Sequence, residues 1–172
     1  RMFGVYELLA AKLKSLPSKV AALLDTVLVR LEGDHRKDLV ASALSLIHCS
    51  RGGLSETELL QLLAGKDQRQ LPRGHWAAIQ RGLESLLRFV GVGEEATLDF
   101  AHQEMSAAVH RRYLRSSSKL KEAHSRLASF FLARADPTGE RSFRGCSDER
   151  AVRELPYHLL AAERTAELKD LL

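Results

Sequence analysis

The stretch FVGVGEEATLDF, residues 89–100, decides the fold. It holds two short runs rich in β-branched and aromatic residues, 89–92 and 96–100, joined by a glycine-containing turn at 93–95. Runs of this kind around a glycine are typical of a β-hairpin. Since the sequence on both sides has helical periodicity, it predicts one small hairpin within a mainly helical protein.

Three helices are expected just before the hairpin. Apolar residues at helical spacing mark one helix at residues 36–49 and another that includes Trp76 and ends near Phe89. Between them, Ser55 and Glu58 form the pattern of a capping box, in which each side chain accepts a hydrogen bond from the backbone N–H of the other residue and a short helix begins. Three helices followed by a hairpin is the order of a winged helix, a variant of the helix-turn-helix.

The winged helix divides the chain into three expected parts. Residues 1–34 form a helical segment that starts with a helix at about 5–13. Residues 35–101 form the winged-helix domain, and residues 102–172 form a helical domain. The fold class is therefore mainly α, with a winged helix followed by a helical bundle or by the start of helical repeats.

Proline, glycine and serine set the expected ends of the outer helices. A helix of the first part would carry Pro17 in its first turn and stop at Gly33. In the last part, helices are expected at about 102–114 and 116–134. A later helix contains Pro156, which we expect at a kink or near the helix start.

Composition fits a helical protein with a real core. The 172 residues are 45% hydrophobic and only 6% aromatic. The formal charge of +4 comes from 26 basic and 22 acidic residues that alternate along the chain, which argues weakly for nucleic acid. Cys49 and Cys146 lie far apart without a Cys-x-x-Cys spacing, so we expect reduced thiols in a cytoplasmic protein. The start at Arg1 and the end within an apolar periodic run suggest a piece of something longer.

The sequence offers no enzyme site. It has no apolar run of about 18 residues for a membrane span and no Gly-x-x-x-x-Gly-Lys-Ser/Thr loop for ATP hydrolysis. His102 and His110 are eight residues apart, whereas metal pairs on a helix favour three or four, so no metal site is expected. Glu122 and His124 are interpreted as parts of a solvated helix face. We therefore predict no catalytic residues, no metal and no cofactor held by this chain alone.

Several strings, in the order in which they occur, resemble a known family. They are Leu16-Pro17 with its helix, the run LVASAL at 39–44 leading into GLSETEL at 53–59, and Phe100-Ala101-His102. This order is similar to the segment downstream of the nucleotide-binding core in STAND-type signal-transduction NTPases, of the NACHT and apoptotic-ATPase kind. The tail LPYHLL, residues 155–160, resembles the segment that joins such a core to helical or WD-type repeats.

The resemblance implies a role for His102. In that family the winged helix packs on the nucleotide-binding domain, and a histidine just after the wing contacts the β-phosphate of bound ADP; His102 matches that position. The resemblance also implies that residues 1–34 end a helical lid and that the parent protein binds ATP or ADP. Met105, Ala107 and Ala108 stand where many members have a bulky aromatic and then an acidic residue. The alternative for His102 is a helix-capping or buried structural histidine.

The leading hypothesis is a regulatory and scaffolding module that packs on an upstream nucleotide-binding domain and couples its ADP or ATP state to downstream repeats. Its partners would be those two parts of the parent and other proteins, with neither nucleic acid nor membrane. An alternative is a nucleic-acid-binding winged helix, whose third helix would present Arg73, His75, Gln80, Arg81 and Arg88. Glu84 on the same side opposes phosphate binding. A passive helical spacer is the remaining alternative.

Overall fold

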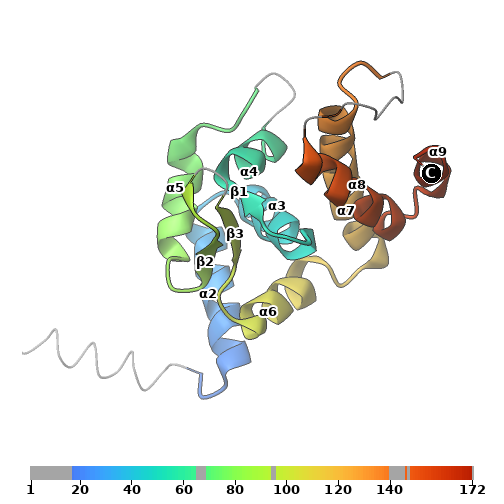
Figure 1. Cartoon of the computed structure of the whole chain (residues 1–172). Coiled ribbons are helices and arrows are strands. Elements are labelled where there is room, and N and C mark those ends of the chain that lie inside the picture. The colour runs from blue at the N-terminus through green and yellow to red at the C-terminus, as the bar shows by residue number, and fades with distance from the viewer. Residues whose placement is uncertain (1–16, 65–68, 94–95, 140–145, 147, 172) are drawn as a thin grey trace, which may run out of the picture.

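A computed structural model describes residues 17–64, 69–93, 96–139, 146 and 148–171 (Figure 1). The chain is mainly helical, and a winged helix precedes a group of C-terminal helices, which confirms the expected fold class. In chain order the elements are α2 (Val20–Asp34), α3 (Lys37–Cys49), β1 (Leu54–Ser55), α4 (Glu56–Leu62), α5 (Arg73–Gly82), β2 (Leu87–Val90), β3 (Thr97–Phe100), α6 (Gln103–Tyr113), α7 (Ser117–Ala135), α8 (Glu149–Ala161) and α9 (Thr165–Asp170).

The described strands form one antiparallel sheet in the order β1-β3-β2. Strands β2 and β3 make the predicted hairpin, with Phe89 opposite Leu98. Strand β1, which places Leu54 opposite the same Leu98, was not predicted. Two residues are too few to show an alternating pattern, so the sequence gave no sign of this strand.

The predicted third helix is too long in one direction. Helix α5 ends at Gly82, and β2 begins at Leu87. Tight turns fill the interval: the backbone N–H of Leu87 donates to the carbonyl of Leu83 at 2.9 Å, and both leucines are buried. Leucines four residues apart therefore meet the core across a turn, which the periodicity did not distinguish from a continued helix.

Two other helix ends differ from the prediction. Helix α2 begins at Val20, so Pro17 precedes it, and it passes through Gly33 to Asp34 before His35 turns extended. Pro156 lies in the interior of α8, not near its start. Its missing N–H leaves the carbonyl of Val152 without the usual helical bond, and because Val152 is exposed, water can reach that group. The expected helix at 5–13 lies outside the described residues.

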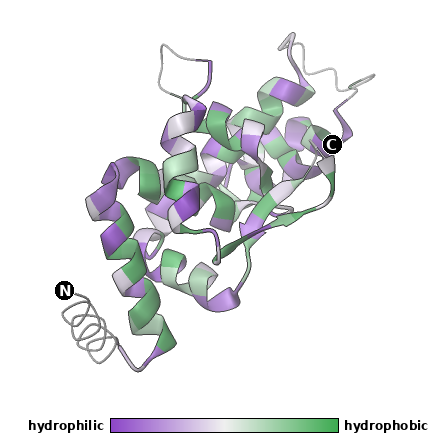
Figure 2. Ribbon diagram, turned by 90° about the vertical axis from the view of Figure 1, so that its left-hand side faces the viewer, coloured by the Kyte–Doolittle hydropathy of each residue, from purple (hydrophilic) through white to green (hydrophobic). Residues whose placement is uncertain are grey.

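One core runs through both the winged helix and the C-terminal helices. Trp76 and Ile79 of α5 are fully buried in the winged helix, and Leu127 and Phe131 of α7 are buried beneath α8. Figure 2 shows the apolar residues of the helices turned inward. Helices α7 and α8 lie against each other, and α7 also packs on α3 and α4 (Figure 1). The C-terminal helices are thus packed directly onto the winged helix.

Candidate functional site

His102 lies where the wing ends and α6 begins. It is the N-cap residue of α6, in extended backbone conformation, and its side chain is exposed. Within the described part of the chain, that side chain forms no capping hydrogen bond with the helix. The interpretation of His102 as a buried histidine is therefore wrong. Its contact with ADP stays a prediction.

The helix after His102 explains two of the departures from the family pattern. Met105 and Ala108 are buried in the core, on the inward side of α6, whereas Ala107 is exposed. The small and flexible apolar residues thus serve packing against the winged helix. Outside the core, Gln103 and Glu104 are exposed beside His102.

The third helix of the winged helix presents its basic residues to solvent, but acidic residues accompany them. Arg73 lies 3.8 Å from a carboxylate oxygen of Glu56, and Arg88 of β2 donates to Asp99 of β3 at 3.0 Å. Asp99 is thus a half-exposed wing residue, as expected. Glu84 is exposed near the same helix, which confirms its predicted place outside the core. These acidic neighbours would oppose a phosphate backbone on this face.

Glu58 connects the winged helix with the C-terminal helices. Its carboxylate accepts the backbone N–H of Ser55 at 2.9 Å, and its own N–H donates to the Ser55 hydroxyl, which confirms the predicted capping box. The same carboxylate accepts from Arg134 of α7 at 2.9 Å and from Arg150 of α8 at 2.9 and 3.2 Å. The side chain of Glu58 is only 5% exposed. One buried carboxylate thus begins α4 and binds both later helices.

Further bonds extend this Glu58 cluster. Arg134 also donates to Asp148, the N-cap of α8, at 2.6 Å. Arg150 donates to the backbone carbonyl of Gly53 at 2.6 Å, just before β1. Each arginine therefore has several acceptors, and the geometry is that of a network in which every charge is paired.

A second polar contact fixes α7 on the winged helix. Arg126 donates to the carbonyl of Leu62 at the end of α4 at 2.9 Å and lies 3.5 Å from the hydroxyl of Ser42 on α3. Because the last carbonyls of a helix lack partners within it, this arginine also caps α4. A movement of the winged helix would thus be transmitted to α7 through two groups of polar bonds.

A comparable contact ties α2 to α6. Glu32 accepts from Arg112 at 2.6 and 2.8 Å and from the Tyr113 hydroxyl at 2.7 Å, and Lys37 lies 3.7 Å away. The hydrogen bond from Arg112 lowers the pKa of Glu32 to about 2. Burial, followed by the bond to Glu32, raises the pKa of Tyr113.

Replacing Glu32 by glutamine is expected to lower the free energy of unfolding by about 1–2 kcal/mol at pH 7. The folded-state pKa lies below the unfolded value, so the contribution of Glu32 is present above about pH 4.5 and is lost as the pH falls toward about 2. Urea unfolding should therefore show the two proteins converging below pH 4.5. Asp25→Asn, at a more exposed ion pair with Arg111, is the control and should change stability by less than about 0.5 kcal/mol. A gap between the proteins that does not depend on pH would contradict this assignment.

The prediction for His124 is wrong. His124 is buried, and its Nδ1 lies 3.1 Å from Nδ1 of His158 on α8, whereas Glu122 is exposed as expected. The sequence held a sign of this, because Leu120, His124, Leu127 and Phe131 recur at helical spacing on one face. Within the described ranges, no group of three or more histidines, cysteines or acidic residues could hold a metal ion. Cys49 and Cys146 are free thiols.

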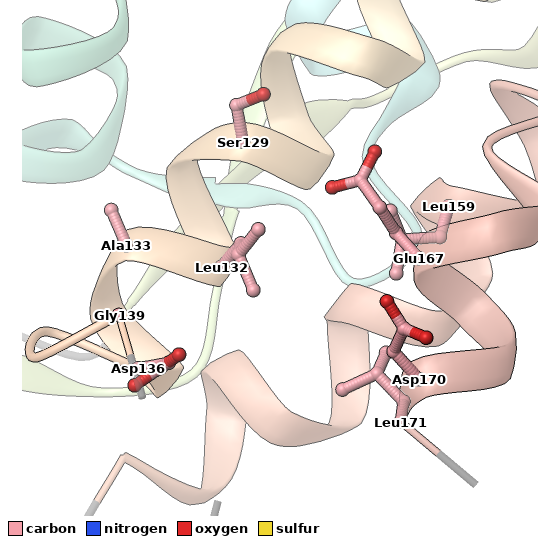
Figure 3. A pocket seen from close by; sticks show the side chains of 9 residues that line it. All are labelled: Ser129, Leu132, Ala133, Asp136, Gly139, Leu159, Glu167, Asp170 and Leu171. Atoms are coloured by element: carbon pink, nitrogen blue, oxygen red, sulfur yellow. The ribbon is translucent and has the colours of Figure 1, made fainter. Parts of the chain in front are cut away.

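A cavity of about 290 Å³ lies between the C-terminal helices (Figure 3). Leu132 of α7, Leu159 of α8 and Leu171 give it an apolar wall, and Arg164 near it donates to the hydroxyl of Ser129 at 2.7 Å. Acidic side chains of Asp136, Glu167 and Asp170 also line it. The cavity is far along the chain from His102 and shares no residue with the Glu58 cluster.

Comparison with known proteins decides the family. The family described as the NWD1-like winged helix-turn-helix domain matches residues 6–121, about two thirds of the chain. The chain belongs to this family. The NWD1-like match covers the winged helix, α6 and the start of α7, so the residues of the cavity lie beyond it.

Relatives of this NWD1-like chain are large repeat-containing proteins. It is 28% identical to mouse telomerase protein component 1, over all of the chain and 7% of that protein. It is 29% identical to human NACHT domain- and WD repeat-containing protein 1, over 82% of the chain and 11% of that protein. It is 28% identical to a TPR repeat-containing protein of Dictyostelium discoideum, over 99% of the chain and 10% of that protein.

These matches confirm the resemblance to STAND-type proteins, and they show that the chain spans about a tenth or less of the relatives' length. No solved structure matches the chain significantly. In the described part, no helix is both long enough and apolar enough to cross a bilayer. Sequence reasoning missed Arg134, Arg150 and His158 as site residues, since nothing in a single sequence pairs them with partners so far away.

Proposed function

We propose that this chain is a regulatory and scaffolding module of a STAND-type NTPase. In this proposal the winged helix packs on an upstream nucleotide-binding domain and couples its ADP or ATP state to downstream repeats. The observation that carries the proposal is the Glu58 cluster, which binds α4 of the winged helix to α7 and α8. A coupling module needs such a connection, because a change of state at one end must alter contacts at the other.

His102 is the residue through which this module would sense the nucleotide. Its side chain is exposed at the N-terminus of α6, where the first backbone N–H groups and the helix dipole favour an anion. A phosphate of ADP from the neighbouring domain could accept a hydrogen bond from this imidazole. The role would be that of a latch that holds one state, with the chemistry of ATP, if any, in the parent protein and not in this chain. A cytoplasmic location belongs to the same proposal.

The relatives support a scaffold more than a nucleic-acid reader. The names of the human and Dictyostelium relatives print WD and TPR repeats. On the chain itself, the exposed Arg73 and Arg88 already have acidic partners, which weakens the alternative of a nucleic-acid-binding winged helix. Duplex DNA binding that weakened steeply with salt would favour that alternative over the scaffold.

Replacing His102 by alanine in the full-length parent protein is expected to speed ADP release by about fivefold to tenfold, since one hydrogen bond to a charged group is worth about 1.5 kcal/mol or more. Release is measured with a fluorescent ADP analogue after dilution into unlabelled nucleotide. His75→Ala is the matched control, because His75 is an exposed histidine on α5, away from the start of α6. Equal release from the His102 variant and the unmodified protein would remove the latch from the proposal.

A further inference from the structure

A row of histidines crosses the contact between the winged helix and the C-terminal helices. His110 of α6 is exposed, His48 of α3 is half-buried, and His124 and His158 are buried. The ring centres of His110 and His48 are 5.4 Å apart, as are those of His124 and His158, and His48 is close enough to His124 to feel its charge. The row thus leads from the surface into the interface.

The inner pair is built for neutral rings. The two Nδ1 atoms of His124 and His158 are 3.1 Å apart, so a hydrogen bond forms only when one of them carries a proton and the other does not. Phe131 stacks on His158 with its ring centre 5.7 Å away, and Tyr157 presents its ring to both histidines at a steep angle. Among the described residues, Nε2 of His158 has no hydrogen-bond partner. The pair therefore sits in an apolar site with few means to bind an added proton.

The charged groups around the pair would not stabilise a cation. Arg150 of α8 acts on His158 as a like charge, and His48 of α3 is the titratable group on the other side. Glu154 lies one helical turn before His158, but its carboxylate is 3.6 Å from Arg153. Glu58 is already bound by Arg134 and Arg150. Within the described residues, neither His124 nor His158 forms a salt bridge with a carboxylate.

We propose that the His124–His158 pair is an acid-sensitive release that frees α8 from α7. A proton on the accepting Nδ1 would turn the N–H···N bond into two opposed N–H groups. A proton on Nε2 of the donating ring would keep the bond but would bury a cation without an acidic partner. Both routes favour a structure in which α8 has moved away and the imidazoles reach water. This inference concerns the chain itself and does not depend on the nucleotide proposal.

The direction of the pH effect follows from burial. Burial, with smaller effects from His124 and Arg150, lowers the pKa of His158 to about 3, and burial also lowers the pKa of His124. Because the folded-state values lie below the ordinary value of 6.5, the stability is fully present above about pH 6.5 and is lost as the pH falls below it. Each histidine that must stay neutral makes opening about tenfold more favourable per pH unit below that value.

The test is hydrogen exchange of the full chain between pH 7.5 and 5.5, corrected for the intrinsic exchange rate. The amides of α8 are expected to open about tenfold more often at pH 5.5 than at 6.5, while those of α3 stay protected. In His158→Gln the increase should shrink, whereas His75→Gln, on the exposed side of α5, should behave like the unmodified chain. If His158→Gln does not fold, the unmodified chain still decides. Opening of α3 together with α8, or α8 protection that does not change with pH, would overturn the proposal.

Discussion

Replacing Glu58 by alanine is expected to lower the free energy of unfolding by about 3 kcal/mol. A buried ion pair that loses one partner usually costs about 3–5 kcal/mol, since the remaining charge stays buried. Here the cost falls at the lower end because Arg134 and Arg150 still reach water, with side chains 36% and 23% exposed. The loss would be a large part of the 5–15 kcal/mol that is typical of a domain.

Two further variants separate the roles of Glu58. Glu58→Gln keeps an acceptor for the N–H of Ser55 but removes the charge, so it should lose most of the same stability. Glu56→Gln, two residues earlier at a half-exposed ion pair with Arg73, is the matched control and should cost less than about 1 kcal/mol. Urea unfolding of the three variants at pH 7 measures each effect. A Glu58→Ala protein within 1 kcal/mol of the unmodified chain would show that the cluster does not hold α7 and α8 to the winged helix.

The sequence predicted best what is local. The capping box at Ser55 and Glu58 involves groups three residues apart, and the structure reproduces both of its hydrogen bonds. The hairpin was also found from its alternating residues and its glycine turn. The end of α5 was placed wrongly, because Leu83 and Leu87 satisfy the core in a turn as well as in a helix. Helix ends depend on which of two local structures the rest of the fold rewards.

Contacts between distant residues could not be predicted from one sequence. Glu58 was recognised only as a helix cap, although its carboxylate also binds arginines 76 and 92 residues later. The periodicity of α7 could have placed His124 on the buried face, but nothing in the sequence pointed to His158 as its partner. The division of the chain at residues 34 and 101 and the nucleotide contact of His102 stay predictions.

The polar bonds and the histidine row act on the same joint in opposite ways. The Glu58 cluster and Arg126 hold α7 and α8 to α4 at any pH at which the carboxylate is charged. The His124–His158 pair holds α8 to α7 only while both rings are neutral. If both assignments are correct, acid would loosen α8 from α7 while α7 stays on the winged helix. The order of release is therefore a consequence of which side chains join which helices.

Replacing Gly53 by alanine is expected to cost about 2–4 kcal/mol. Gly53 has φ of +74°, a conformation that costs an ordinary residue about 1–2 kcal/mol. An added Cβ would also lie 2.7 Å from the carbonyl oxygen of Leu98 and 2.8 Å from the Thr97 hydroxyl, and overpacking of this kind costs about 1–3 kcal/mol. Since Arg150 donates to the carbonyl of Gly53, the backbone shift that relieves the clash should also disturb the Glu58 cluster.

Gly93 offers a control that separates strain from crowding. Its φ of +72° is nearly the same, but nothing among the described residues lies within 4 Å of an added Cβ. Gly93→Ala should therefore cost only the conformational part, about 1–2 kcal/mol. Urea unfolding of both variants gives the difference, which is the energy of the close approach between Gly53 and β3. Equal losses in the two variants would mean that β3 yields freely at this point, and the sheet would then be a poor support for the arginine that joins α8 to the winged helix.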